Sequence, residues 1–271
     1  MELQEIPVNG TNISQANFST DGLTSDQFFS SGIAIVLYPT EGEKQDLAKL
    51  KDYLNRLPGV LWVGSVFDLE DAPIFAFEET SNIPSFPEER ERIVFSTSPG
   101  MFQQVNINLN GKLRQLVTQY VKSKNPSKIL DLFCGSGNLS LMLSDQNRYI
   151  EGIETNRSSI KCAQFNVAIN NIQNSQYFRG DTEAHLWKCA KKGESFDLVL
   201  TDPPREGMYK GIIPLLKIFP KNIVYVSCDP ATLARDLGSL CNKGYKIEKI
   251  EAFDFFPNTY HVETAVFLER N

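Results

Sequence analysis

The first 133 residues contain no cysteine, and the five cysteines that follow have no regular spacing. They are Cys134, Cys162, Cys189, Cys228 and Cys241, and no pair has the two-residue separation that is common among zinc and iron–sulfur ligands. An odd number of scattered cysteines also argues against a disulfide framework. We therefore expect no metal site, no iron–sulfur cluster, and a reducing cytoplasmic compartment.

Long apolar runs and early positive charges are also missing. The longest apolar run, at residues 32–38, is far shorter than the ~20 residues that cross a bilayer, so no membrane partner is expected. No Lys or Arg precedes Lys44, which excludes a secretory signal. Residues 1–95 hold 6 Lys/Arg against 16 Asp/Glu, whereas residues 96–271 hold 21 against 17. A polyanionic partner would therefore be bound by the second part.

The pattern changes near residue 95, and this change predicts three regions. Residues 1–30 are polar and are expected to form a flexible tail. Residues 31–95 predict a small α+β domain, with strands at 32–38, 60–67 and 72–79 and an amphipathic helix at 43–57. Two prolines and a charge run then precede the second domain, residues 96–271.

Strands and helices alternate regularly in the second domain. The expected strands are 128–133, 149–154, 176–180, 196–202 and 222–227, and the expected helices are 108–124, 138–146, 157–171, 182–191, 211–219 and 230–240. Two last strands, 245–254 and 262–270, have no helix between them and predict a closing antiparallel hairpin. The fold class is therefore α/β, a doubly wound and mostly parallel sheet.

Chemically useful residues follow the strands of this sheet, where ligands bind in such folds. Gly135 and Gly137 allow a tight turn after the first strand, but Ser140 replaces the third glycine of a dinucleotide fingerprint, which argues against NAD. Three acids end the next three strands: Glu154, Asp181 and Asp202. Each acid alone is commonly a helix cap. Together with the glycine turn they predict a pocket for S-adenosylmethionine, a cationic nucleoside, with Phe133 as one wall.

Four segments resemble, in order, the signature segments of the RNA 5-methyluridine (uracil-C5) methyltransferases. They are DLFCGSGN at 131–138, DPPR at 202–205, SCDPATLARDL at 227–237 and FPNTYHVET at 256–264. The segment SPGMFQQVN at 98–106 is similar to the start of that family's catalytic domain. The resemblance covers residues 95–271. It implies a class I methyltransferase fold, S-adenosylmethionine as cofactor, and rRNA or tRNA as partner.

The resemblance also assigns roles to residues. Cys228 would be the nucleophile that adds to C6 of uracil, and Glu263 the base that removes the C5 proton. The N-terminus of the helix after Cys228 is expected to favour its thiolate. Gln104 and Asn138 match further cofactor-side positions, beside Glu154, Asp181 and Asp202.

Two features depart from the family pattern. Relatives commonly carry a barrel before the catalytic domain, and we expect no counterpart of it here; we also expect no iron–sulfur site, because no cysteine precedes residue 134. Two alternatives therefore stay open. One is a cofactor-binding protein in which RNA methylation is lost or depends on a partner. The other is a cytosine-C5 methyltransferase, although Cys228 lacks the Pro-Cys or Thr-Cys-Ser context expected there.

Overall fold

The computed structural model describes most of the chain after residue 91 and separate segments before it. The described residues are 2–7, 13–16, 33–38, 51–52, 54–56, 60–65, 74–80, 92–99, 101–102, 104, 106–259 and 261–270. Within them, no helix combines the length and the apolar character that a membrane span requires.

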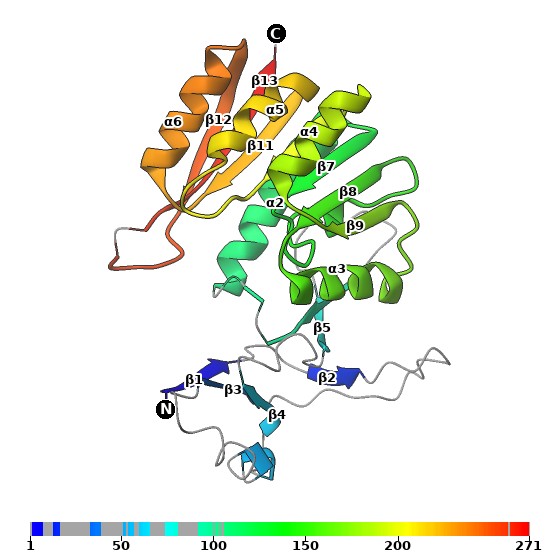
Figure 1. The fold of residues 1–271 in the computed structure, drawn as a ribbon, viewed down its shortest axis with the longest axis vertical. Coiled ribbons are helices and arrows are strands. Elements are labelled where there is room, and N and C mark those ends of the chain that lie inside the picture. Colours follow the sequence, from blue (N-terminus) through cyan, green and yellow to red (C-terminus); the bar gives the residue numbers. More distant parts are fainter. Residues whose placement is uncertain are drawn as a thin grey trace.

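The C-terminal part is one seven-stranded sheet covered by helices on both faces (Figure 1). Its strand order is β12-β13-β11-β10-β7-β8-β9. Within this sheet, the five strands that come first in the sequence, β7 to β11, are mutually parallel. The strands are β7 (Lys128–Leu132), β8 (Tyr149–Glu154), β9 (Ser175–Arg179), β10 (Leu198–Thr201), β11 (Asn222–Ser227), β12 (Tyr245–Phe253) and β13 (Glu263–Arg270). The predicted fold class, including the closing antiparallel hairpin, is confirmed.

Alternate residues of the central strands supply two separate cores. Leu130 and Leu132 pack with α4 (Thr182–Lys192), α5 (Ile212–Ile218) and α6 (Pro230–Cys241) on one face. Ile129 points to the other face, where it packs with α2 (Ile107–Lys124), while α3 (Arg157–Ile169) joins a third cluster there. The two-residue period of a strand explains this division. Both faces are apolar, so the polar residues of the sheet gather at its ends.

One predicted helix is wrong. Residues 138–146 contain only a single 3₁₀ turn, Leu141–Leu143. The side chains around this turn explain why: the Ser140 hydroxyl bonds to Tyr177 and the Ser144 hydroxyl donates to the carbonyl of Leu141. The Ser144 bond is local and competes with a continuous helix, whereas the Ser140 bond ties the turn to Tyr177 of β9.

The segments before residue 98 form two three-stranded sheets, with orders β1-β3-β4 and β2-β5-β6. Their strands are β1 (Glu2–Pro7), β2 (Ile13–Ala16), β3 (Ile33–Tyr38), β4 (Val60–Ser65), β5 (Ile74–Thr80) and β6 (Arg92–Thr97). Strands β3, β4 and β5 were predicted, whereas β1, β2 and β6 were not.

Strand β6 crosses positions 95–96, where the sequence predicts a domain boundary, and Ile93 and Phe95 pack against α3 and β9. The three-part division of the chain stays a prediction. Of the predicted helix 43–57, residues 51, 52, 54 and 55 are helical, and apart from residue 56 the rest lies outside the described residues.

Replacing Phe267 by Ala should destabilise the protein strongly. The Phe267 ring is fully buried and lies 4.7 Å from the ring of Tyr120, centroid to centroid. The cavity left behind should lower the free energy of unfolding by about 3–5 kcal/mol, measured by urea denaturation. Phe178 is 44% exposed, and Phe178→Ala is the matched control, with an expected loss of about 1 kcal/mol or less. Equal losses would contradict the core assignment.

Candidate active site

The carboxyl ends of the five parallel strands meet at one edge of the sheet, and each is followed by a predicted site residue. Phe133 follows β7, Glu154 ends β8, Asp181 follows β9 by two residues, Asp202 follows β10, and Cys228 follows β11. Strand β7 lies between β8 and β10, which is the point where the strand order reverses. Ligands bind at this switch point in doubly wound sheets.

The turn after β7 brings backbone close to this edge. Gly137 has φ +86°, and a Cβ atom there would lie 3.0 Å from the Tyr177 hydroxyl, so a larger residue would be both strained and crowded. The N–H of Gly135 donates to Glu154 Oε2 over 3.3 Å. The glycine turn after β7 and the acid that ends β8 are therefore directly joined.

A cleft of about 180 Å³ opens beside this turn. Phe133, in a left-handed conformation with φ +58°, forms part of its wall together with Asp181, and Met208 and Tyr209 close it from the loop after β10. The predicted wall residue and one predicted acid thus share one cavity. Met208 and Tyr209 were not predicted, and only their position just after the DPPR segment could have indicated them.

Glu154 and Asp181 also bond to backbone near the starts of helices, although α3 itself is capped by Asn156. Glu154 Oε1 accepts from the N–H of Asn156 over 2.8 Å, and Asp181 Oδ1 accepts from the N–H of Ala184 over 2.8 Å as the N-cap of α4. The capping role considered from the sequence is therefore real for Asp181. It occupies one carboxylate oxygen, and the second remains available to a ligand in the cleft.

Asp131 is a buried acid that the sequence analysis did not identify. It is 2% exposed, and its Oδ2 atom has no hydrogen-bond partner. Burial raises its pKa to about 7, and the charges of Asp202 and Glu154 act in the same direction. Burial likewise raises the pKa of Asp202 to about 6. An acid within the otherwise apolar KILDL strand was the available signal, since buried charges require a partner.

Neither Gln104 nor Asn138 lines this cleft. Gln104 has a buried side-chain oxygen, Oε1, with no hydrogen-bond partner. The amide of Asn138 exchanges two hydrogen bonds with Asn110 of α2, at 2.9 and 3.0 Å. Gln104 thus presents an unused acceptor, whereas Asn138 is anchored to α2.

Cys228 and Glu263 meet because β13 runs antiparallel to β11. Ser227 is paired with Thr264. The residue after Ser227, Cys228, and the residue before Thr264, Glu263, therefore lie at the same edge. Cys228 is partly exposed, whereas Glu263 is 5% exposed. The two predicted catalytic residues are therefore brought together, and Asp202 interacts electrostatically with both.

The charge around Cys228 differs from the sequence expectation. Burial raises the pKa of its thiol, and the acids Glu263 and Asp202 add to this rise. Two weaker influences lower this pKa: a backbone hydrogen bond at Cys228 and then the charge of Arg205. Helix α6, whose N-terminus was expected to favour the thiolate, begins at Pro230, after its N-cap Asp229.

Arg205 also contacts the segment that carries Glu263. Its Nη2 atom donates to Nε2 of His261 over 3.1 Å, and because a guanidinium cannot accept, the neutral ring must carry its proton on Nδ1. His261, two residues before Glu263 in the chain, therefore lies against Arg205.

The fold is that of the class I methyltransferases. A *Pyrococcus abyssi* tRNA (uracil-54, C5)-methyltransferase, solved in complex with S-adenosyl-L-homocysteine, is 26% identical with a TM-score of 0.61, over 88% of this chain and 57% of that one. A SAM-dependent methyltransferase from *Agrobacterium tumefaciens* has a TM-score of 0.52 at 14% identity, over 66% of this chain and 67% of that one. That second likeness concerns the fold alone.

The chain belongs to the tRNA (uracil-5-)-methyltransferase family, whose model matches residues 84–271. A *Pseudomonas entomophila* relative named 23S rRNA (uracil(1939)-C(5))-methyltransferase RlmD is 33% identical over 83% of this chain and 48% of its own. An uncharacterised RNA methyltransferase of *Clostridium tetani* is 39% identical over 64% of this chain and 38% of its own. The chain spans about half the length of such relatives or less.

Replacing Glu263 by Gln should stabilise the protein in alkali and leave it unchanged in acid. Burial raises the pKa of the Glu263 carboxyl from 4.5 to about 8, with the charge of Asp202 contributing. The folded protein therefore holds a proton that the unfolded chain releases, so wild-type stability falls as the pH rises from 4.5 to 8. Gln cannot ionise and avoids this loss, which should give about 1–4 kcal/mol at pH ~9.

Urea unfolding of both proteins at about pH 4 and pH 9 measures this difference. Glu251→Gln is the matched control, because Glu251 is exposed and only pairs with Lys249 at the surface, 3.3 Å away. A Glu263→Gln protein with the same stability gain, or none, at both pH values would contradict the raised pKa of Glu263.

Proposed function

We propose that this chain methylates C5 of uridine in rRNA or tRNA, with S-adenosylmethionine as methyl donor and a transient Cys228–C6 bond. The observation that carries the proposal is the meeting of Cys228 and Glu263 at the carboxyl edge of the sheet, the same edge at which Phe133 and Asp181 line the cleft. Family membership and the names of the RlmD and tRNA methyltransferase relatives support the same substrate class.

The chemistry of the predicted residues and of Asp131 fits S-adenosylmethionine, although of these only Phe133 and Asp181 line the cleft. Buried acceptors without partners, Gln104 Oε1 and Asp131 Oδ2, are what an ammonium or amino group requires. The raised pKa values of Asp131 and Asp202 mark acids that a nearby positive ligand would stabilise as anions. We propose that the cofactor, which supplies a methyl group on a cationic sulfur, is held by the predicted residues, Gln104, Phe133, Asn138, Glu154, Asp181 and Asp202, with Asp131 beside them.

Cys228 would begin the reaction from the exposed side of the site. Its sulfur bonds to C6 of uracil, and the electron pair of the C5–C6 double bond moves to C5 and the O4 carbonyl, which makes C5 nucleophilic. The positive charge of Arg205 favours the thiolate that this step needs. Phe102 is 72% exposed two residues before Gln104, and we propose that it stacks on the displaced base.

Glu263 would complete the reaction. Once C5 carries both the methyl group and its original hydrogen, the carboxylate removes that proton, the double bond re-forms, and the thiolate leaves from C6. Because the Glu263 pKa is raised to about 8 in the free protein, activity should increase with pH until the carboxyl is ionised.

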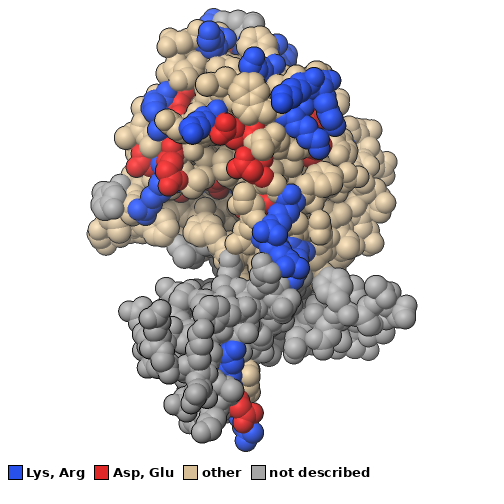
Figure 2. All heavy atoms as spheres, in the orientation of Figure 1, with Lys and Arg blue, Asp and Glu red and all other residues tan. Residues whose placement is uncertain are grey.

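RNA would approach the edge that carries this site. Figure 2 shows Lys and Arg side chains in several groups on one face, with Asp and Glu side chains between them, so that no single sign covers it. Attraction for the RNA backbone would therefore come from separate cations near the site. Arg205 and Lys210, in the loop after β10, are two such cations. In a reducing cytosol, where we place this activity, the five free cysteines would stay reduced.

Incubation with methyl-labelled S-adenosylmethionine and RNA from cells that lack this modification should label 5-methyluridine. Cys228→Ala should reduce the rate by at least about 10³-fold, because covalent activation of C5 is lost. Cys241→Ala is the matched control, since Cys241 is exposed at the far end of α6, and it should keep full activity. Nucleoside digestion and mass spectrometry identify the labelled base.

Other outcomes would favour the alternatives. Label in 5-methylcytidine would identify a cytosine enzyme, and tight cofactor binding without any label would favour a cofactor-binding protein in which methylation is lost or needs a partner. An active Cys228→Ala protein would remove Cys228 from the mechanism.

Glu263→Gln should stop the reaction after methyl transfer. The amide cannot accept the C5 proton, so the Cys228–RNA adduct should accumulate as a band that survives denaturing electrophoresis. RNA containing 5-fluorouridine should trap the wild-type protein in the same way, because fluorine does not leave as a cation. Normal turnover by Glu263→Gln would show that another group removes the proton.

A further inference from the structure

The loop between β10 and α5, residues 203–211, serves the proposed site in two places. Arg205 supplies the charge that lowers the pKa of the Cys228 thiol. Met208, Tyr209 and Lys210 line the cleft. The loop has no strand or long helix of its own, apart from the 3₁₀ turn Tyr209–Gly211, so its position must come from contacts with its surroundings.

Helix α6 holds this loop by successive hydrogen bonds. The hydroxyl of Thr232 donates to the carbonyl oxygen of Arg205 over 2.9 Å. The Nη2 atom of Arg235, one turn further along α6, donates to the carbonyl oxygen of Glu206 over 2.7 Å. Two consecutive loop carbonyls are therefore bound by residues i and i+3 of one helix, which lie on the same face.

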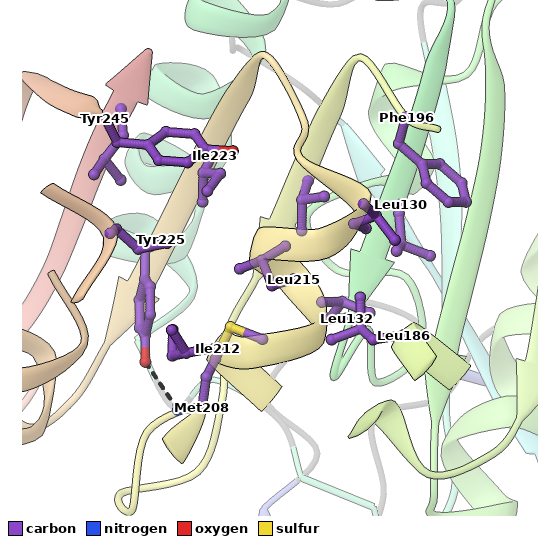
Figure 3. Close-up of a cluster of buried hydrophobic side chains, with 14 of the residues drawn as sticks. Leu130, Leu132, Leu186, Phe196, Met208, Ile212, Leu215, Ile223, Tyr225 and Tyr245 are labelled. Carbon is purple, nitrogen blue, oxygen red and sulfur yellow. Dashed lines mark hydrogen bonds between the residues drawn. The ribbon is translucent and has the colours of Figure 1, made fainter. Parts of the chain in front are cut away.

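Asp236 adds a buried anchor. It is 2% exposed, and its Oδ2 atom accepts from the N–H of Met208 over 2.8 Å and from the hydroxyl of Tyr225 over 2.7 Å. Its Oδ1 atom accepts from Nε of Arg235 over 2.9 Å. Figure 3 shows the Tyr225 hydroxyl and its bond to Met208 at the edge of the core cluster.

Gly207 shows how closely loop and helix approach. Its φ is +73°, and a Cβ atom at this position would lie 2.6 Å from Asp236 Oδ2 and 2.8 Å from Arg235 Nη2. Real side chains do not make contacts of this length, so only glycine allows the loop to lie directly on the Arg235–Asp236 pair. The REGM and ARDL parts of the sequence are therefore two halves of one contact.

We propose that Asp236, with Thr232 and Arg235, is a positioning residue: it holds loop 203–211 so that Arg205 stays beside Cys228 and Met208 stays at the cleft. Its relevance to catalysis depends on the proposed function, in which Cys228 is the nucleophile. Helix α6 begins two residues after Cys228, so the thiol and the loop are both placed by one helix. Besides these contacts to α6, the bond from Arg205 to His261 also ties the loop to the site.

The test replaces Asp236 by Asn, which keeps the shape of the side chain but replaces one acceptor oxygen by an NH2 group. That group is a donor and cannot accept the bonds that the oxygen accepted. Two measurements need no RNA: the rate of Cys228 alkylation by iodoacetamide against pH, followed by peptide mass spectrometry, and the affinity for S-adenosylhomocysteine, followed by calorimetry. Once Arg205 moves away, Cys228 alkylation near neutral pH should slow by about threefold and its pH profile should move upward. The dissociation constant should rise by about tenfold as Met208 shifts.

Alkylation of the exposed Cys241 is the internal control in the same experiment, and its rate should be the same in Asp236→Asn as in the wild type. Glu251→Gln removes one negative charge from the surface and should leave both measurements as in wild type. A merely structural role would lower the melting temperature without moving the Cys228 profile, and an unchanged profile in folded Asp236→Asn overturns the proposal.

If Asp236→Asn does not fold, Thr232→Val and Arg235→Lys decide the question. Thr232→Val removes the bond to the Arg205 carbonyl together with the hydroxyl's bonds to Asp229, and Arg235→Lys alters the bonds to Glu206 and Asp236. We expect smaller shifts of the Cys228 profile in the same direction, and no shift in either variant overturns the proposal. Because methylation enters neither measurement, a wild-type protein that fails to methylate RNA would refute the proposed function and leave this result standing.

Discussion

The antiparallel pairing of β13 with β11 is the constraint on which the site depends. Five parallel strands bring Phe133, Glu154, Asp181, Asp202 and Cys228 to one edge, but a sixth parallel strand would present its carboxyl end there and not its start. Because β13 runs the other way, its first residue, Glu263, arrives at that edge. The backbone register alone therefore places a buried carboxyl beside the thiol across 35 residues of chain, as the pairing of Ser227 with Thr264 requires.

The electrostatics of this edge are unfavourable in the free protein. Asp131, Asp202 and Glu263 are acids with raised pKa values, and Asp202 and Glu263 add to the rise in the pKa of the Cys228 thiol. Like charges in a low-dielectric site hold protons instead of ionising together. A cationic ligand would offset this repulsion, and among the groups around Cys228 it is Arg205 that acts in the same favourable sense. The hydrogen bonds from Thr232, Arg235 and Asp236 of α6 to the loop after β10 matter because they keep Arg205 in place.

Most elements of the catalytic domain follow from hydrophobic periodicity. Strands such as β7 and β11 are short apolar runs, and helices such as α4 and α6 carry apolar residues at helical spacing with Asp at their N-caps. The prediction failed where side-chain bonds hold the backbone: the local bond of Ser144 and the bond of Ser140 to Tyr177 accompany the single 3₁₀ turn within residues 138–146. It also failed for β6, whose Ile93 and Phe95 follow a run of charged residues and gain their burial only against α3.

The sequence by itself determined the fold class, the family, and the residue types at the strand ends, because these depend on short-range patterns and on signature segments. It identified Cys228 and Glu263 as a pair only through resemblance, since spacing along the chain does not state which strand runs antiparallel. The tertiary structure decided their contact, the burial that raises their pKa values, and the docking of Gly207 on Asp236. Each of these depends on distances between segments that are remote in sequence, and such distances exist only once the sheet and its helices have packed.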